Sequence, residues 1–478
     1  MQRQKNFIGG EWQDASQARD NINPSDTSDI VGVFSQAEAP DVATAVSAAK
    51  AVTTEWAGST PQQRFDVLDF IGTEILARKA ELGRLLSREE GKTLPEGIGE
   101  TARAGQLFKF FAGEALRMSG EHIRSVRPGI GVDVQREPIG VVGLITPWNF
   151  PIAIPAWKIA PALAFGNAVI FKPADLVPGC AWALAEIIAR SGLPKGVFNL
   201  IMGKGSIVGE ALVNHPDVSG ISFTGSVAVG RQLAVKCVQR MAKVQLEMGG
   251  KNPQVVLDDA DLDTAVNCAI NGAYFSTGQR CTASSRLIVT AGIHDKFVEA
   301  MKKKVEQLKV DDALAEGTQI GPVVDEAQLS KNFEYIEIAK SEGGNLICGG
   351  QHLQREKDGY YMAPALITET DNSMRINREE VFGPVASVIK VKDYEEALAV
   401  ANDTEFGLSS GICTTSLKYA EHFRNNADAG MVMVNLPTAG VDYHVPFGGR
   451  KGSSYGTREQ GSYAVEFYTT VKTSYTLA

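Results

Sequence analysis

The most informative stretch of the chain is IGVVGLIT at residues 139–146, together with four later runs that are also rich in valine, isoleucine and leucine: NAVIFK (167–172), VFNLI (197–201), VSGISF (218–223) and KVQLEM (243–248). Stretches long enough for a helix separate these runs. The last four begin at steps of 30, 21 and 25 residues, which accommodate a strand, a crossover helix and two short loops. This alternation predicts an α/β fold built on a doubly wound parallel sheet.

A second series of strand-like runs begins just after the Gly249-Gly250 pair. It comprises PQVVL (253–257), SSRLIVT (284–290) and, further along the chain, SVIKV and GMVMVN. Helices are expected before and after SSRLIVT. The pattern predicts a second α/β unit.

The clearest helical pattern lies upstream, in residues 61–90. Its apolar side chains recur every three or four residues, with one step of two full turns: Phe65, Leu68, Ile71, Ile75, Leu82 and Leu86. Thr60 with Gln63 forms a capping box at the start, and Gly91 marks the end. We expect a helix over 61–90.

Two strand-like pieces belong to neither sheet by their order in the sequence. Residues 129–140 (GIGVDVQREPIG) alternate apolar and polar side chains like a hairpin, and the tail at 464–475 (AVEFYTTVKTSY) alternates similarly. We expect them to form a projecting flap between subunits.

Composition excludes several classes of protein. The 478 residues carry a net charge of −9, so no electrostatic footprint predicts binding to nucleic acid or to an anionic membrane surface. The first thirty residues contain no apolar signal region, and no apolar run is long enough to span a membrane. Six scattered cysteines without a C-x-x-C pair fit a reducing cytoplasm, and six histidines without H-E-x-x-H predict no bound metal.

Three residues are candidates for catalysis. Cys281 lies at a glycine-containing turn in FSTGQRCTASSR (275–286), where the neighbouring Arg280 would favour a thiolate; the alternative is a small buried apolar residue, as we expect for Cys268. Glu247 ends a strand before two glycines, where a carboxylate can act as a base or can simply be solvated. Asn149 lies between two prolines, and its amide can donate to an oxyanion or stabilise the turn.

Seven motifs, in order and at characteristic distances, resemble the aldehyde dehydrogenase superfamily: PWNFP, FKPAD, FTGS, LEMGGKNP, GQRC, EEVFGPV and PFGGRKGSS. The similarity runs from about residue 6 to the last strand. It implies a Rossmann-like dinucleotide-binding domain (1–117 and 139–248), a catalytic α/β domain (249–448) and a small β oligomerisation flap (118–138 and 460–478). It also implies a homodimer or homotetramer.

The resemblance implies roles for individual residues. Cys281 matches the nucleophile, Glu247 the general base, and Asn149 an oxyanion donor that acts with the backbone N–H of Cys281. Those at the cofactor, NAD or NADP, are Ile145, Thr146, Pro147, Trp148, Lys172, Gly225, Ser226, Glu380 and Phe382. Asp175 stands where a glutamate commonly binds the ribose hydroxyls of NAD and repels a 2′-phosphate, which favours NAD over NADP.

The implied reaction converts an aldehyde to a carboxylic acid through a thiohemiacetal and a thioester on Cys281, which water activated by Glu247 then hydrolyses. The motifs are most similar to those of bacterial α-ketoglutaric semialdehyde dehydrogenases. Succinic or glutaric semialdehyde and a broad range of aliphatic or aromatic aldehydes are alternative substrates. Phe150, Ile154 and Trp157 would form an apolar wall, and the loop 436–447 would close the mouth.

A substrate carboxylate would need a partner, and the candidates are Arg280, Arg103 and His444. Each is also interpretable as a solvated or structurally paired side chain. A non-catalytic relative would be expected to lack Cys281 or Glu247, and both are present. A cofactor-independent cysteine hydrolase would need an activating histidine, for which the motifs offer only His444.

Overall fold

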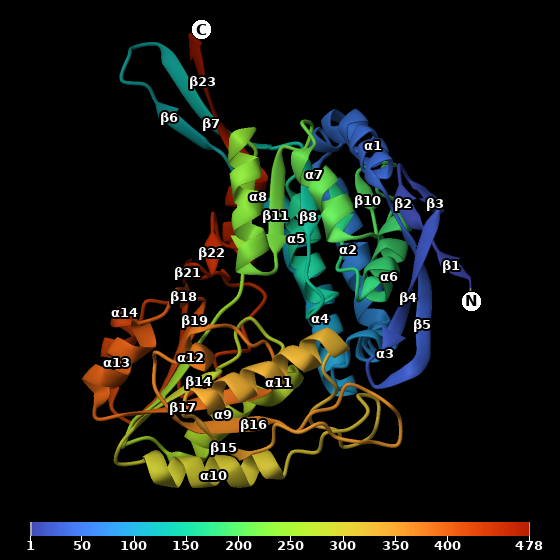
Figure 1. The fold of residues 1–478 in the computed structure, drawn as a ribbon. Helices are drawn as coiled ribbons and strands as arrows, with labels where there is room; N and C mark the ends of the chain where they lie inside the picture. The colour runs from blue at the N-terminus through green and yellow to red at the C-terminus, as the bar shows by residue number, and fades with distance from the viewer. Residues whose placement is uncertain (1, 478) are drawn as a thin grey trace.

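The computed structural model describes residues 2–477 of the chain. Residue 1 of the predicted dinucleotide-binding domain and residue 478 of the predicted flap lie outside the described residues. Two large sheets lie one above the other in Figure 1, with helices packed around each and a narrow three-stranded sheet projecting at the top. The α/β class predicted from the sequence is confirmed. Within residues 2–477, no helix is both long and apolar enough to cross a membrane.

The first large sheet has eight strands. In spatial order they are β22 (Ser454–Tyr455), β12 (Lys243–Glu247), β11 (Gly220–Thr224), β8 (Val141–Ile145), β9 (Ala168–Lys172), β10 (Phe198–Leu200), β2 (Asn6–Ile8) and β3 (Glu11–Gln13). The five strands from β12 to β10 are mutually parallel, and the outer strands are antiparallel. These five are the strands predicted from the valine- and isoleucine-rich runs.

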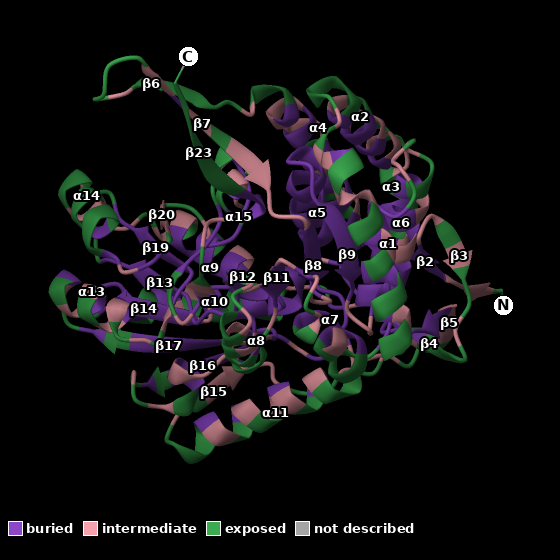
Figure 2. Ribbon diagram, turned by 90° about the horizontal axis from the view of Figure 1, so that it is seen from above, coloured by how far each residue is buried: buried purple, intermediate pink, exposed green. Residues whose placement is uncertain are grey.

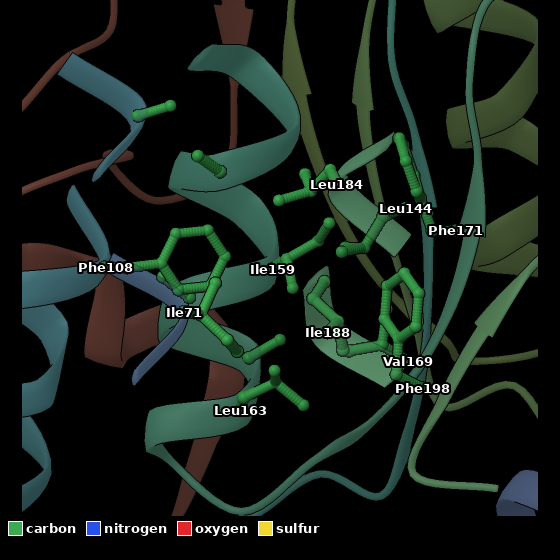
Figure 3. Close-up of a cluster of buried hydrophobic side chains, with 14 of the residues drawn as sticks. Ile71, Phe108, Leu144, Ile159, Leu163, Val169, Phe171, Leu184, Ile188 and Phe198 are labelled. Carbon is green, nitrogen blue, oxygen red and sulfur yellow. The ribbon is translucent and has the colours of Figure 1, made fainter. Parts of the chain in front are cut away.

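Alternation within β9 shows why this sheet is covered on both faces. Val169 and Phe171 point into one apolar core, whereas Ala168 and Ile170 point into another. Figure 3 shows part of the first core, formed by side chains from β8 to β10 and from the helices over them: Ile71, Phe108, Leu144, Ile159, Leu163, Val169, Phe171, Leu184, Ile188 and Phe198. Burial on both faces is typical of a doubly wound parallel sheet.

The helices of this part of the chain flank that sheet. They are α1 (Ala39–Ala57), α2 (Pro61–Ala77), α3 (Lys79–Glu90), α4 (Leu94–Arg117), α5 (Ala153–Ala164), α6 (Pro178–Ala189), η1 (Gly205–Gly209), α7 (Glu210–Asn214) and α8 (Val227–Gln239). Figure 2 shows their buried sides turned inward and their exposed sides turned to solvent. A separate small sheet is formed by β1 (Arg3–Gln4), β5 (Asp26–Gln36) and β4 (Gln17–Asn23).

The prediction of one helix over 61–90 is wrong in one respect, because the chain breaks at Arg78 into α2 and α3. The predicted capping box at Thr60 and the left-handed Gly91 are both present. The break lets α3 press against α4 at a glycine contact, where a Cβ on Gly83 would lie 2.6 Å from the backbone nitrogen of Ile98. Helical spacing continues across the break, so the sequence pattern gave no sign of it.

The second large sheet has seven strands. In spatial order they are β15 (Asn345–Cys348), β16 (Ala365–Thr370), β17 (Val385–Val391), β14 (Arg286–Thr290), β13 (Pro253–Val256), β19 (Ser409–Cys413) and β20 (Met431–Val434). All pairs are parallel except β15 with β16. Its helices are α9 (Leu262–Tyr274), η2 (Phe275–Gly278), α10 (His294–Glu306), α11 (Glu326–Ser341), α12 (Arg375–Arg378), α13 (Tyr394–Asn402) and α14 (Leu417–Asn426), while β18 (Phe406–Gly407) pairs with β21 (Arg450–Lys451).

The projecting sheet consists of β23 (Thr469–Leu477), β7 (Ile130–Pro138) and β6 (Glu121–Arg124). The expected hairpin within 129–140 is wrong, because this stretch is a single strand that pairs with β6 on one side and β23 on the other. The turn precedes it, at Pro128 and Gly129. Residues before β23 form η3 (Ser462–Ala464) and α15 (Val465–Tyr468) rather than strand.

Candidate functional site

Four neighbouring parallel strands end at one edge of the first sheet. Glu247, Ile145 and Lys172 are the last residues of β12, β8 and β9, and Thr224 ends the intervening β11. Ile145 pairs with Lys172, and Thr224 pairs with Glu247. The carboxyl edge of a parallel sheet is where α/β proteins bind ligands, and the predicted residues gather there.

The loop that carries Cys281 has an unusual backbone. Ser276, Thr277 and Gly278 all have left-handed backbone angles, with φ of 52°, 55° and 65°. The carboxylate of Glu96, on α4, accepts hydrogen bonds from the backbone N–H and the hydroxyl of Ser276 at 2.8 and 3.1 Å. Non-glycine residues in this conformation are costly, so the surrounding structure holds Cys281 at a fixed place.

Cys281 lies where two cavities meet, since it lines both. The larger, of about 620 Å³, is also lined by Phe150, Trp157 and the loop around Leu436. The smaller, of about 180 Å³, is lined by Pro147, Trp148, Asn149, Ile154, Gly225, Ser226, Glu380 and Phe382. A group in either cavity can therefore reach the sulfur from its own side.

The charges around Cys281 disfavour its thiolate. Burial, together with the charges of Glu380 and Glu247, raises the pKa of the Cys281 thiol to about 12, although the backbone N–H groups of Thr282 and Cys281 oppose the shift. The net shift runs against the thiolate expected beside Arg280, whose guanidinium is directed to the carbonyl oxygens of Asn271 and Gly272. The thiol needs a base to react.

Asn149 is held through both its side-chain amide and its backbone carbonyl oxygen. Its Nδ2 donates to the carbonyl oxygen of Gln279 at 3.0 Å, two residues before Cys281. Its own carbonyl oxygen accepts a hydrogen bond from the buried Lys92 ammonium. The amide has a second N–H, and Asn149 shares the smaller cavity with Cys281, so it can donate to an oxygen bound beside the sulfur.

Glu247 is buried but does not line either cavity. Its Oε2 accepts a hydrogen bond of 2.6 Å from the Ser454 hydroxyl, and its Oε1 is buried without a partner. Burial and the charge of Glu459 raise the pKa of Glu247 well above its usual range, although the Ser454 hydrogen bond and Lys158 oppose this. Such a carboxyl group is a stronger base than an exposed glutamate.

The carboxylate of Glu380 lies against the glycine pair Gly249-Gly250, which follows Glu247 in the sequence. Its carboxylate accepts a hydrogen bond from the backbone N–H of Gly250 at 2.8 Å. A Cβ on Gly249 would lie 2.4 Å from Glu380 Oε2, so any larger residue would displace the Glu380 carboxylate. The glycine pair therefore brings Glu380 against the strand end and into the smaller cavity.

Aromatic side chains form another wall of the smaller cavity. Trp148 and Phe382 meet edge to face with ring centroids 5.3 Å apart. Gly225 and Ser226 begin α8, and the Ser226 side chain accepts a hydrogen bond from the backbone N–H of Val229. Of the predicted run 145–148, only Pro147 and Trp148 are among the residues that line this cavity.

Lys172 and Asp175 lie further along the strand edge and line neither cavity. Burial lowers the pKa of Lys172 to about 8, although the charge of Asp175 opposes the shift. Asp175 forms an ion pair with Arg19 of β4, an interaction that the sequence did not indicate. Asp175 Oδ1 is buried without a partner.

The larger cavity has the expected aromatic wall in part. Phe150 and Trp157 both line it, and Trp157 packs against Phe447 with ring centroids 5.3 Å apart. The loop 436–447 contributes Leu436, Pro437, Ala439, Gly440, Val441 and Phe447.

Two expected residues of this wall lie elsewhere. Ile154 lines the smaller cavity instead, although it lies only three residues before Trp157 on α5. His444 is exposed, packs edge to face on Tyr443, and is not among the residues that line either cavity.

Arg280 and Arg103 both line the larger cavity. Arg280 is engaged by the carbonyl oxygens at the end of α9, whereas Arg103 donates through Nη2 to the side-chain oxygen of Gln460 at 3.1 Å. The Cζ atom of Arg103 lies 6.0 Å from the centre of the Trp157 ring.

The sequence analysis missed a group of buried charges beside this cavity. Lys92 forms ion pairs with Glu100 at 3.1 Å and Glu90 at 3.6 Å, and Glu100 also accepts from the backbone N–H groups that begin α5. Glu96, Glu100 and Arg103 are spaced four and three residues apart, which places them on one face of α4. That charged stripe on a largely apolar helix was the available signal.

No group of three or more histidine, cysteine, aspartate or glutamate side chains arranged to hold a metal ion occurs among residues 2–477. The Aldehyde dehydrogenase family matches residues 12–474 of the chain. The chain is 44% identical over 476 residues to the α-ketoglutaric semialdehyde dehydrogenase of Bacillus subtilis, covering 98% of this chain and 97% of that protein. It is 39% identical over 458 residues to the 2,5-dioxopentanoate dehydrogenase of Saccharolobus solfataricus, covering 95% of each.

Solved structures give the same result. The betaine aldehyde dehydrogenase of Staphylococcus aureus in complex with NAD⁺ superposes with a TM-score of 0.97 at 35% identity, covering 99% of this chain and 95% of that one. An NADP-dependent enzyme of E. coli superposes with a TM-score of 0.96 at 36% identity, covering 100% and 98%.

Proposed function

Since the chain belongs to the aldehyde dehydrogenase family and is an NAD(P)-dependent enzyme, we propose that it oxidises a semialdehyde with a carboxylate at its other end, such as α-ketoglutaric semialdehyde (2,5-dioxopentanoate), to the dicarboxylic acid. The observation that carries this proposal is Cys281 at the meeting point of two cavities. One cavity suits the coenzyme and the other a small aldehyde.

The polar groups along the strand edge fit a dinucleotide. Thr146 Oγ1, Thr224 Oγ1 and Asp175 Oδ1 are buried without partners, and Ser226 begins a helix of 13 residues, whose N-terminus favours a pyrophosphate. The residues that would hold the coenzyme are Ile145, Thr146, Pro147, Trp148, Lys172, Asp175, Gly225, Ser226, Glu380 and Phe382. When bound, NAD(P)⁺ accepts a hydride from the adduct on Cys281, which leaves a thioester. We propose NAD as the preferred coenzyme because the Asp175 carboxylate repels a 2′-phosphate.

The first chemical step is the addition of Cys281 Sγ to the aldehyde carbon, which requires loss of the thiol proton. The raised pKa of Glu247 suits it to accept that proton. The alkoxide that forms is stabilised by Asn149 Nδ2 and the backbone N–H of Cys281. Gln279 and Lys92 orient Asn149 for this role through the hydrogen bonds on its amide and its carbonyl oxygen.

The second step is hydrolysis of the thioester. Glu247 turns from Ser454 toward Cys281, takes a proton from water, and the hydroxide displaces the sulfur to release the acid. Acyl transfer to coenzyme A or to phosphate needs no such base, so the buried Glu247 supports a hydrolytic enzyme.

Substitution Glu247→Gln tests this assignment. We expect a burst of NAD(P)H close to one equivalent per active site that forms more slowly than in the wild type, because the thiol then loses its proton to water instead of Glu247. Steady-state turnover falls further, by about 10²- to 10⁴-fold, because hydrolysis of the thioester loses its base. Stopped-flow absorbance at the NAD(P)H band separates the two phases. Unchanged turnover without a burst would remove Glu247 from deacylation.

A second candidate function is the oxidation of apolar or aromatic aldehydes, favoured by the aromatic wall of Phe150, Trp157 and Phe447. Saturation curves for 2,5-dioxopentanoate, succinic semialdehyde and hexanal with both coenzymes distinguish the two. A higher kcat/KM for hexanal would favour this second function.

We further propose that residues 1–117 and 139–248 act as the dinucleotide-binding domain, residues 249–448 as the catalytic domain, and residues 118–138 with 460–478 as a flap that binds a second copy of the chain. The strand edges of the projecting sheet and the exposed apolar side chains of β23 support the last assignment. A homodimer or a homotetramer would result.

A further inference from the structure

Two residues that line the larger cavity, and one neighbour of theirs, carry hydrogen-bond donors that have no acceptor. Arg103 Nε, Trp157 Nε1 and Gln460 Nε2 are each buried without a partner. The three side chains are neighbours, because Arg103 donates to the Gln460 side-chain oxygen at 3.1 Å and stands 6.0 Å from the centre of the Trp157 ring. Arg103 and Trp157 line the cavity that Cys281 also lines.

Buried polar groups in folded proteins are almost always hydrogen-bonded, so three unpaired groups at one place call for a ligand. All three are donors, and one belongs to a cation. The group that satisfies them must offer several acceptor oxygens and a negative charge. A carboxylate has both.

Carboxylates of the chain itself are engaged elsewhere. Glu100 accepts from Lys92 and from the backbone N–H groups of Ile152 and Ala153, and Glu96 accepts from Ser276 and Thr93. Asp442 acts on Arg103 only through its charge and is itself exposed.

Arg280 lines the same cavity, and its Nε is likewise buried without a partner. The two arginines differ in their other contacts. Nη2 of Arg280 is directed to the backbone carbonyl oxygens of Asn271 and Gly272, so its charge serves the loop before Cys281. Arg103 instead donates to the side chain of Gln460, and its neighbours Gln460 and Trp157 carry unpaired donors of their own.

We propose that Arg103, Trp157 Nε1 and Gln460 Nε2 bind the carboxylate of the substrate at the end opposite to its aldehyde. The inference rests on the proposed function, in which the aldehyde carbon meets Cys281. It adds to that function the residues that select an aldehyde with a carboxylate at its other end. An aldehyde without the carboxylate leaves these donors unpaired, and sites built for hydrogen bonding reject such analogues strongly.

The test measures kcat/KM for 2,5-dioxopentanoate and for pentanal, which has the same chain length and no carboxylate. In Arg103→Met the ratio of the two values is expected to fall at least about thirtyfold, and Arg103→Lys is expected to recover part of it. Trp157→Phe keeps an aromatic ring but removes Nε1, and a fall of about threefold to tenfold is expected. Arg84→Met, at an exposed arginine of α3, is the matched control with an unchanged ratio.

A direct binding measurement keeps the inference independent of turnover. Titration of the Cys281→Ala variant with glutarate, by calorimetry, is expected to show binding that Arg103→Met in the same background loses. An unchanged ratio in Arg103→Met, or equal loss for both substrates, would overturn the carboxylate site while leaving semialdehyde oxidation intact. A wild-type preference for pentanal would overturn the proposed substrate, and glutarate binding that depends on Arg103 would then still support the site.

Discussion

Cys281 shows how the environment of one side chain controls its chemistry. Burial and two carboxylates hold its pKa high, so the reactive thiolate is a minor species near neutral pH. The charge of the adjacent Arg280, whose guanidinium is hydrogen-bonded to carbonyl oxygens, does not outweigh these effects. The reactivity of the thiol is then governed first by its burial and next by the charges of Glu380 and Glu247.

Alkylation by iodoacetamide reports the pKa of Cys281 directly. Because the pKa of about 12 lies far above neutrality, the rate in the coenzyme-free enzyme is expected to rise about tenfold per pH unit between about pH 7 and about pH 10, without a plateau. Glu380→Gln removes a negative charge that disfavours the thiolate, so its pKa falls and alkylation at a given pH is faster. Mass spectrometry of the peptide that contains Cys281 measures the rate. A plateau below about pH 9 in the wild-type protein would contradict the assigned environment.

At the scale of elements, the ion pair between Arg19 of β4 and Asp175 joins the small N-terminal sheet to the loop after β9. A bound 2′-phosphate would meet an anion in Asp175 and cations in Lys172 and Arg19. The coenzyme preference then depends on two opposite charges. One is that of Arg19, on a strand near the N-terminus, and the other is that of Asp175, in a loop more than a hundred residues later.

Opposite changes in coenzyme preference are therefore expected from the two partners of this pair. Asp175→Asn removes the repulsion and raises the ratio of kcat/KM for NADP to that for NAD about tenfold. Arg19→Ala removes a cation and lowers the ratio about threefold to tenfold. Binding of 2′,5′-ADP, followed by calorimetry, is expected to change in the same directions. Shifts of the same sign in both variants would mean that the pair acts through folding rather than through charge.

The sequence predicted those elements whose signals are local. Valine- and isoleucine-rich runs located β8 to β12 to within two residues, because strands buried on both faces must be apolar throughout. The break at Arg78 was missed because helical spacing continues across it. Interactions between distant residues, such as Arg19 with Asp175 or Glu96 with Ser276, leave no local signal.

The same distinction between local signals and long-range interactions applies to the candidate site. Motif positions brought Cys281, Asn149 and the groove residues to one place, although only some of them follow strand ends. Asn149 and Ser226 come after β8 and β11, whereas Cys281 and Glu380 come before β14 and β17. Ile154 and His444 were expected at the larger cavity, but Ile154 lines the smaller one and His444 lines neither. A motif encodes neither the path of a loop nor the rotation of a helix about its axis. Gln460 and Trp157 acquire meaning only beside Arg103, which is 357 positions from Gln460.

At the scale of the whole molecule, the projecting sheet is the part that the two α/β units leave without a partner. Apart from Thr469, every residue of β23 is exposed, and Figure 1 shows the sheet extending away from both units. Alternate residues of β23 present one apolar face: Val471, Tyr475 and Leu477, which are 54%, 63% and 74% exposed. Exposed apolar faces of this kind mark interfaces between proteins.

The double substitution Val471→Glu and Tyr475→Glu tests the proposed contact between copies of the chain. Wild-type protein is expected to sediment as a dimer or a tetramer, and the variant as a smaller species, because charges on the buried face of an isologous contact repel their symmetry mates. The matched control is Leu417→Glu, because Leu417 is 87% exposed. It belongs to α14, a helix that lies away from the projecting sheet in Figure 1. Analytical ultracentrifugation distinguishes the species, and circular dichroism verifies that the variant is folded. A monomeric wild-type protein, or an unchanged assembly in the folded double variant, would show that β23 does not bind a second copy.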